Sequence, residues 1–203
     1  MLQTQTVVPD LVELLKKLML EKSFSNYNLV GGTALALQIG HRNSVDIDLF
    51  GDQPIDHDLY TEILTNLGTY EVSKSSKNVF ISLINNIKVD FVNYRYPLID
   101  KPLEIEGIRM LSKKDIAAMK MNAISGRGSK KDFIDLYFLL KEFTLGEMMD
   151  FYNQKYFDGS EFLVYKSLSY FEEANIQPEP KMFFDFSWEK CKKTIIDEIN
   201  KFQ

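Results

Sequence analysis

One stretch, residues 28–50, constrains the fold of this chain more than any other. Leu29 and Val30 end a short apolar run, and the two glycines that follow tolerate a positive φ, so they predict a tight turn. Residues 33–39 are good helix formers and predict a helix that ends at Gly40. The stretch therefore predicts a strand, a glycine turn, a helix, a short loop and a second strand.

The second strand of this stretch alternates apolar and acidic side chains. A period of two places its apolar side chains on one face: Val45, Ile47 and Leu49. Asp46 and Asp48 then project together from the other face, where their charges repel. A divalent cation compensates best, because Mg²⁺ takes oxygen ligands, commonly one or two carboxylates plus substrate phosphates. The pair therefore predicts a site for Mg²⁺ or Mn²⁺, although many strands with this pattern present only a solvated face.

The glycine turn predicts a site for the opposite charge. N–H groups at such a turn and in the first turn of a helix point outward, and the helix dipole favours an anion. Gly31, Gly32 and Thr33 are therefore expected to bind phosphate. Each half is weak alone, but the two together, with thirteen residues between Gly32 and Asp46, are much more specific.

The spacing of these residues resembles a known signature. Gly31-Gly32-Thr33, then twelve residues, then Asp46-Ile47-Asp48 is similar to the DNA polymerase β-like nucleotidyltransferase superfamily. The longer pattern resembles the AbiEii/AbiGii-type nucleotidyltransferase toxins, which act in bacterial toxin–antitoxin and phage-defence systems; it reads Gly-Gly-Thr-Ala-Leu-Ala-Leu and then Gly-His-Arg-x-Ser-x-Asp-Ile-Asp-Leu-Phe. The resemblance covers about residues 25–145.

A third carboxylate follows in the most strand-like part of the chain. Strands are expected at residues 70–73 and 79–84, with a hairpin turn at Asn85-Asn86 and a further strand after it. Asp90 lies in that last strand, where aspartate is disfavoured. It could be a solvent-facing residue of an edge strand. The resemblance implies instead that Asp90 is the third metal ligand of the family, with Asp46 and Asp48.

Residues 112–143 resemble the second motif of the family, a lysine-bearing helix, an arginine and then Lys-Asp-Phe-x-Asp-Leu. Ser112 is expected to cap the first helix, and Ser129 to cap a second helix at 130–143. The resemblance implies catalytic roles for Lys120 and Asp132, and nucleotide binding by Lys120, Arg127 and Lys131; Asp135 belongs to the same motif. The alternatives are a solvated helix face for the basic residues and stabilisation of the helix dipole for the aspartates.

The loop before the second strand contains His41 and Arg42. We expect Arg42 to bind the nucleotide, but pairing with Asp46 or Asp52 is equally open. Without a Cys or His cluster, a zinc site has no support. The chain also lacks the Gly-x-Ser-x-Gly and Gly-x-x-x-x-Gly-Lys patterns of α/β hydrolases and P-loop proteins.

The expected fold is α+β, a small mixed sheet with helices against it, followed by a helical C-terminal lobe. We expect the nucleotidyltransferase core at residues 1–110 and the helical lobe at 111–203. The remaining expected elements are an opening helix at 9–23, a helix from Leu59 to about Gly68, one short strand at 104–110, helical structure at 146–172, a linker at 173–181 and a final helix at 188–202.

Charge and composition limit the kinds of partner and the cellular location that can be expected. The net charge is −5, yet residues 109–131 hold seven basic residues and one acidic residue, so this segment is +6 and the remainder −11. A locally basic segment suits a polyanionic ligand.

The single cysteine, Cys191, rules out an intrachain disulfide and is expected to be an inert thiol. No apolar run is long enough for a membrane span and no signal peptide is evident, so a cytoplasmic protein is expected.

The resemblance implies a reaction. With Mg²⁺ or Mn²⁺, the chain would transfer a nucleoside monophosphate from an NTP to an acceptor hydroxyl, with the 3′ end of tRNA as the expected acceptor and an antitoxin protein as a further partner. Two alternatives remain. The fold could serve as a binding module for a nucleotide or partner without turnover, or the same chemistry could modify a small molecule or a protein.

Overall fold

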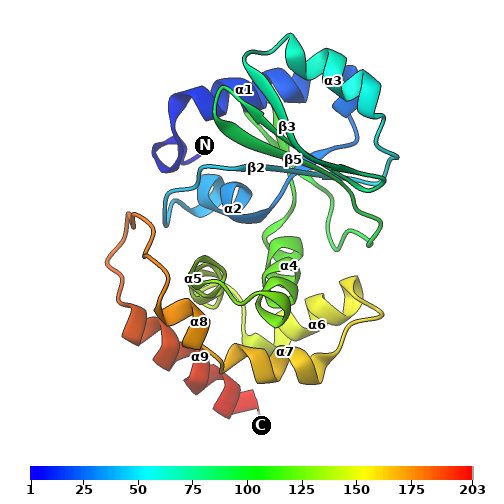
Figure 1. The fold of residues 1–203 in the computed structure, drawn as a ribbon. Coiled ribbons are helices and arrows are strands. Elements are labelled where there is room, and N and C mark those ends of the chain that lie inside the picture. Colours follow the sequence, from blue (N-terminus) through cyan, green and yellow to red (C-terminus); the bar gives the residue numbers. More distant parts are fainter. Residues whose placement is uncertain (203) are drawn as a thin grey trace. The chain divides into compact units, whose positions relative to one another are not determined.

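The computed structural model describes the backbone of residues 1–202 and the side chains of residues 1–201. The chain forms two compact units, whose elements can be followed in Figure 1. The sheet unit comprises Met1–Arg95 and Pro102–Leu111, and the helical unit comprises Tyr96–Lys101 and the chain from Ser112 to the C-terminal helix. The expected α+β class, with a mixed sheet and a helical C-terminal part, is confirmed.

The sheet unit is built on a mixed sheet with seven strands among the described residues, in the order β3-β4-β5-β2-β1-β7-β6. The strands are β1 Asn28–Leu29, β2 Ile47–Gly51, β3 Tyr70–Ser76, β4 Val79–Ile84, β5 Ile87–Asn93, β6 Leu103–Ile105 and β7 Ile108–Met110. β2 and β5 pair in parallel, as do β1 and β7, and the other pairs are antiparallel. The acidic strand β2 therefore lies in the middle of the sheet, with a neighbour on both sides.

One face of this sheet holds an aromatic core. Its members are Phe24, Tyr27, Tyr60 of α3 (His57–Thr65), Phe80 of β4 and Phe91 of β5, all buried. The rings of Phe24 and Phe91 lie 4.6 Å apart between centroids, and Tyr60 contacts both. Successive side chains of a strand alternate between faces. Because Phe91 points into this core, its neighbour Asp90 points to the opposite face.

Several local predictions are confirmed by the backbone. Asn85 and Asn86 both adopt positive φ, at 50° and 65°, and form the two-residue hairpin between β4 and β5. Gly40 ends α2 (Gly31–Ile39) in the left-handed conformation, with φ 76°. α1 (Pro9–Leu20) ends three residues earlier than expected and is followed by a 3₁₀ turn at Lys22–Phe24.

Two strand predictions were wrong. Val45 does not share the buried face of β2: the strand begins at Ile47 and the Val45 side chain is 48% exposed. Residues 104–110 form a hairpin of β6 and β7 and not one strand. Its turn residues, Glu106 and Gly107, have φ of 53° and 79°, and glutamate gives little sequence signal for that left-handed conformation.

The helical unit contains α4 Lys113–Gly126, α5 Lys130–Leu139, α6 Leu145–Lys155, α7 Glu161–Leu168, α8 Glu172–Asn175 and α9 Trp188–Phe202. α9 matches the predicted final helix. The second helix of the basic motif ends at Leu139, earlier than expected, and the helical region at 146–172 is broken after Lys155. There a loop ends at Ser160, whose side chain caps α7. The predicted linker at 173–181 begins within α8.

A buried ion pair joins three parts of the helical unit. Asp115, in the first turn of α4, lies 2.8 Å from the ammonium of Lys155, at the end of α6, and both side chains are fully buried. The Asp115 carboxylate also accepts hydrogen bonds from the main-chain N–H groups of Ile99 and Asp100, and Lys155 donates to the carbonyl oxygen of Pro97. The pair therefore fixes Tyr96–Lys101 to α4 and α6.

A membrane-crossing helix would need a long apolar stretch. None of the helices described between residues 1 and 202 has the length and apolar character for it.

Candidate active site

The sheet brings two of the three predicted carboxylates together. Asp48 of β2 and Asp90 of β5 are register partners on adjacent parallel strands. Adjacent strands lie about 4.8 Å apart, and register partners project from the same face. Since Ile47, Leu49, Val89 and Phe91 are buried on the core face, the two aspartates share the other face, and both are half-buried.

Asp46 lies one residue before this ladder begins. Its carbonyl oxygen accepts a hydrogen bond from the hydroxyl of Thr33. Across the described part of the chain, no group of three or more His, Cys, Asp or Glu side chains is arranged to hold a metal ion. The structure thus pairs Asp48 with Asp90, and a metal-binding role for Asp46 stays a prediction.

The carboxylate of Asp90 has two unlike oxygens. Oδ2 accepts a hydrogen bond from the ammonium of Lys88, at 2.5 Å. Oδ1 is buried and has no hydrogen-bond partner among the described residues. A buried polar oxygen without a partner is costly, so such an atom calls for an explanation. An oxygen ligand for a hard cation is one that the chemistry of the carboxylate pair fits.

The glycine turn lies directly against this pair. Gly31 has φ +67°, and a Cβ at this position would come within 2.8 Å of Asp48 Oδ2. Glycine is therefore required twice, by the backbone conformation and by the closeness of the carboxylate. α2 begins here after Val30, and in the described part of the chain no side chain caps it. The N–H groups of its first turn can therefore meet phosphate oxygens.

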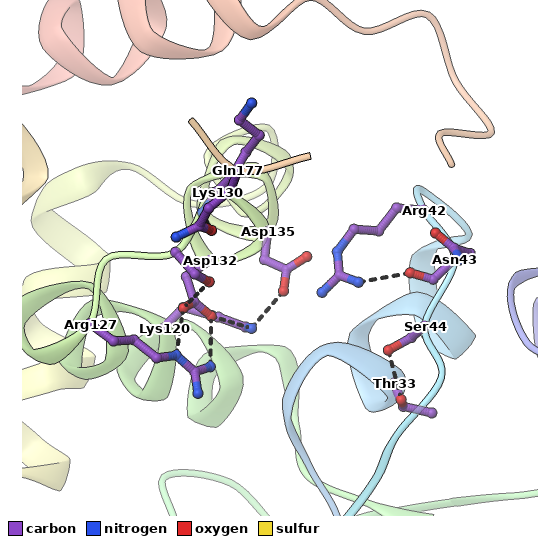
Figure 2. A network of polar contacts seen from close by, with 11 residues as sticks. Thr33, Arg42, Asn43, Ser44, Lys120, Arg127, Lys130, Asp132, Asp135 and Gln177 are labelled. Atoms are coloured by element: carbon purple, nitrogen blue, oxygen red, sulfur yellow. Dashed lines mark hydrogen bonds and ion pairs between the residues drawn. The ribbon is translucent and has the colours of Figure 1, made fainter. Parts of the chain in front are cut away.

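Two hydroxyls fix the first turn of α2 to the loop before β2 (Figure 2). Thr33 and Ser44 share a buried hydrogen bond of 2.8 Å between their hydroxyl oxygens. Thr33 also donates to the carbonyl oxygen of Asp46. Thr33 is only 1% exposed, and its hydroxyl is hydrogen-bonded within the protein. The main-chain N–H of Thr33 is therefore the group that we expect to contact phosphate.

Arg42 belongs to the same loop and is almost fully buried. Its Nη1 donates to the carbonyl oxygen of Asn43 at 2.8 Å (Figure 2). A Cβ on Gly32 would collide with Nη2 of Arg42, so the guanidinium lies against the glycine turn. A guanidinium beside uncapped helix N–H groups adds positive charge where phosphate is expected. Binding of the nucleotide by Arg42 stays a prediction.

The helical unit assembles most of its predicted residues in one cluster (Figure 2). The ammonium of Lys120 lies 2.9 Å from Asp132 and 2.6 Å from Asp135, and all three side chains are buried. Arg127 donates to both oxygens of Asp132, at 2.9 and 3.2 Å. Lys131, by contrast, is exposed. The motif therefore forms a cluster of ion pairs in which the buried carboxylate of Asp132 joins buried Lys120 to exposed Arg127.

Asp132 is held ionised by this cluster. Burial alone would raise its pKa, but the charges and hydrogen bonds of Lys120 and Arg127, with the hydroxyl of Ser129, outweigh burial and hold the pKa below its ordinary value of 3.8. Ser129 occupies the N-cap position of α5, as predicted, but its side chain makes no capping hydrogen bond and donates instead to Asp132 Oδ2 at 2.6 Å.

Several basic residues of the segment 109–131 have hydrogen-bond or ion-pair partners within the protein. Arg109 donates to three main-chain carbonyl oxygens of the sheet unit, those of Met19, Phe24 and Tyr27. Three of the lysines form ion pairs: Lys113 with Glu142, Lys114 with Asp100, and Lys120 with both Asp132 and Asp135. The +6 counted along the sequence is therefore no measure of the charge that a nucleic acid would meet.

Two residues of the candidate site were not found from the sequence. The hydroxyl of Ser44 is hydrogen-bonded to the hydroxyl of Thr33, and Lys88 forms an ion pair with Asp90. The signal for Lys88 was its position two residues before Asp90 in an alternating strand, which places both on one face. Ser44 is the serine of the family-like pattern Gly-His-Arg-x-Ser-x-Asp, but that pattern did not reveal that its partner is Thr33.

Comparison with known proteins decides the family. Residues 13–200 match the family described as "Nucleotidyl transferase AbiEii toxin, Type IV TA system". The chain belongs to the AbiEii nucleotidyltransferase toxin family. The match includes both the glycine turn with Asp48 and Asp90 and the cluster around Lys120, and it extends beyond residues 25–145, the segment covered by the resemblance, at both ends.

Individual proteins are similar to this chain in sequence or in fold. The Aquifex aeolicus protein aq_aa25, described as uncharacterized, is 39% identical over 156 residues, 74% of this chain and 76% of its own. MenT4, the nucleotidyltransferase toxin Rv2826c from Mycobacterium tuberculosis H37Rv, has a similar fold with a TM-score of 0.61 at 14% identity, covering 94% of this chain and 82% of its own. ANT(2")-Ia, solved in complex with adenylyl-2"-tobramycin, has a TM-score of 0.52 at 18% identity, covering 70% and 95%.

Proposed function

We propose that this nucleotidyltransferase transfers a nucleoside monophosphate from an NTP to an acceptor hydroxyl, with Mg²⁺ or Mn²⁺. The acceptor oxygen forms a bond to the α-phosphorus, the bond from that phosphorus to the bridging oxygen breaks, and pyrophosphate and the hydroxyl proton are released. The observation that carries the proposal is the register pair of Asp48 and Asp90 beside the glycine turn. Family membership supports the reaction class.

Asp48 and Asp90 are proposed to hold the divalent cation, with Asp46 as the third ligand. The partnerless Oδ1 of Asp90 and the shared face of Asp48 and Asp90 support this role. When bound, the cation would lower the charge of the triphosphate and stabilise the entering and leaving oxygens.

Gly31, Gly32 and Thr33 are proposed to bind the triphosphate through their main-chain N–H groups. Those groups open α2 without a side-chain cap, and Arg42 adds a guanidinium beside them. Preorganised donors of this kind stabilise charge that develops on phosphate oxygens without having to reorganise. The hydrogen bonds of Thr33 with Ser44 and Asp46 keep the turn and the acidic strand at a fixed spacing.

In the helical unit, Lys120, Arg127 and Lys131 remain our candidates for binding the nucleotide. Arg127 is the best supported, because its side chain is 70% exposed while Asp132 fixes its guanidinium from one side. For Asp132 the contacts favour a positioning role, since its carboxylate accepts from Lys120, Arg127 and Ser129 together. Lys120 is held by two carboxylates and would contribute its charge from a fixed place.

We propose an RNA 3′ end, of tRNA in particular, as the acceptor, and a cognate antitoxin as the protein partner. The toxin family supports this setting, and MenT4 is itself a nucleotidyltransferase toxin. We also propose a cytoplasmic location, where an NTP substrate is available, and a role in phage defence. The ion pairs of Lys113 and Lys114 weaken the argument for RNA that was based on the charge of the basic segment. A small-molecule acceptor is the second candidate, because ANT(2")-Ia shares the fold and was solved with adenylyl-2"-tobramycin.

The catalytic assignment is tested by changing single carboxylates. Asp48→Asn and Asp90→Asn should each abolish transfer from labelled NTP while the circular dichroism spectrum is retained. Asp52→Asn is the matched control: it removes the same charge from an exposed aspartate just beyond β2 and should keep activity. Full activity of Asp48→Asn or Asp90→Asn would refute the proposed site.

The acceptor is tested in one matrix. Each labelled NTP is incubated with Mg²⁺ and either total bacterial RNA, purified tRNA, an aminoglycoside mixture or protein extract, and the label is followed to product. Label at the 3′ end of tRNA would support the first candidate. Label only on the aminoglycosides would replace it with the second. Binding of NTP without any transfer would favour the binding-module alternative.

A further inference from the structure

The ion pair at Asp90 lies within the proposed metal site. Lys88 and Asp90 are two residues apart on β5, so both project from the face that bears Asp48. The ammonium of Lys88 lies 2.5 Å from Asp90 Oδ2, and the two side chains are 41% and 15% exposed. A lysine in this position carries positive charge to the group that is proposed to bind a cation.

The neighbours of Asp90 leave its two oxygens with different roles. On β4 its register partner is Ile81, which offers no polar group, and on β2 it is Asp48, which adds negative charge. Lys88 occupies Oδ2, and Oδ1 has no hydrogen-bond partner among the described residues. The ammonium therefore compensates part of the acidic charge and holds the carboxylate by one oxygen only.

We propose that Lys88 is a tethered cation that takes the place of part of the metal charge in the metal-free protein. It stabilises the acidic pair when no metal is bound, and it weakens the binding of the divalent ion that must share Asp90 with it. Lys88 is thus a positioning residue that sets the metal affinity of the site. This inference rests on the proposed function, which assigns the metal to Asp48 and Asp90.

The size of the effect follows from charge and exposure. An ammonium and a cation bound to the two oxygens of one carboxylate lie within a few ångströms, where repulsion is strong at low dielectric and weak in water. Because the Lys88 side chain is 41% exposed, solvent screens a large part of that repulsion. Removal of the charge should therefore tighten binding of the divalent ion by about tenfold.

The test measures Mn²⁺ binding to the full chain, without NTP, by electron paramagnetic resonance of the free ion. Lys88→Met should bind Mn²⁺ about tenfold more tightly than the wild type, and Lys88→Arg, which keeps the charge, should resemble the wild type. Lys74→Met is the matched control, because it removes the same charge from an exposed lysine of β3, with the whole of β4 between it and Asp90. It should change binding less than Lys88→Met does.

Thermal melting gives a second readout with the opposite sign. Without metal, Lys88→Met should melt below the wild type, because the carboxylates lose their compensating charge. With saturating Mn²⁺ the gain in melting temperature should be larger for the variant, since tighter binding to the folded state stabilises it more. If Lys88→Met does not fold, Lys88→Gln serves the same comparison. A role in folding alone would lower stability without tightening metal binding.

The outcomes separate this inference from the function beneath it. If the wild type binds Mn²⁺, Asp48→Asn abolishes that binding, and Lys88→Met binds no more tightly than the wild type, the role of Lys88 is wrong and the metal site stands. If neither the wild type nor Lys88→Met binds Mn²⁺ in an Asp48-dependent way, the proposed metal site and the role of Lys88 both fall.

Discussion

Asp115→Asn should destabilise the helical unit strongly. The substitution keeps the shape of the side chain but removes the negative charge that pairs with the fully buried ammonium of Lys155. Removing one partner of a buried ion pair typically costs about 3–5 kcal/mol, because the other charge stays buried and uncompensated. For a chain of this size, that loss lowers the melting temperature by roughly 10 °C.

Lys155→Met should cost less than Asp115→Asn. The Asp115 carboxylate would still accept hydrogen bonds from the N–H groups of Ile99 and Asp100 and from the hydroxyl of Ser112. A methionine would also keep most of the buried apolar stem, so about 1–3 kcal/mol is expected. In the double variant the two losses should not add, because neither charge is then left alone.

The single tryptophan allows the stability of the helical unit to be measured by fluorescence. Trp188 lies in α9 of the helical unit, so its fluorescence during urea unfolding reports that unit. Free energies of unfolding from these curves give the two single losses and the coupling between them. A loss below about 1 kcal/mol for Asp115→Asn, or simple additivity in the double variant, would refute the reasoning.

Three further predictions concern single residues. Gly31→Ala should lose transfer and about 1–2 kcal/mol of stability in assays of activity and urea unfolding, because its φ is +67° and the new Cβ would meet Asp48. The lowered pKa of Asp132 means that its stabilisation is complete above its ordinary value of 3.8 and is lost as the pH falls below it, so Asp132→Asn should flatten the acid limb of a melting profile. Burial raises the pKa of the Cys191 thiol to about 12, so it should react with a disulfide reagent at pH 8 only after unfolding.

Local chemistry made part of the fold predictable. Asn85 and Asn86 tolerate the left-handed conformation, Gly40 prefers it, and both the hairpin and the end of α2 were found from these residues. Ser112 likewise caps α4 through the N–H of Asp115, as predicted. In each case the deciding interaction lies within a few residues of the signal, so the sequence carries the whole cause.

The residues whose roles were mispredicted or missed have partners far away in the sequence or adopt uncommon backbone conformations. Serine is a residue type that commonly caps helices, but the hydroxyl of Ser129 donates a hydrogen bond to Asp132, whose carboxylate also accepts one from Lys120. Asp115 was found as part of a cap, yet its main partner, Lys155, is forty residues away. Asp90 itself could be matched only through the family resemblance, because the register that places it beside Asp48 depends on a parallel pairing of strands separated in sequence.

The segment Tyr96–Lys101 has a consequence for the order of folding. It is synthesised between β5 and β6 of the sheet unit, but its anchors in the helical unit, Asp115 and Lys155, follow later in the chain. As the nascent chain leaves the ribosome, the N–H groups of Ile99 and Asp100 stay with water until Asp115 emerges, and the carbonyl of Pro97 until Lys155 emerges. The helical unit therefore includes contacts that span β6 and β7 in the sequence, non-local contacts of the kind that slow folding.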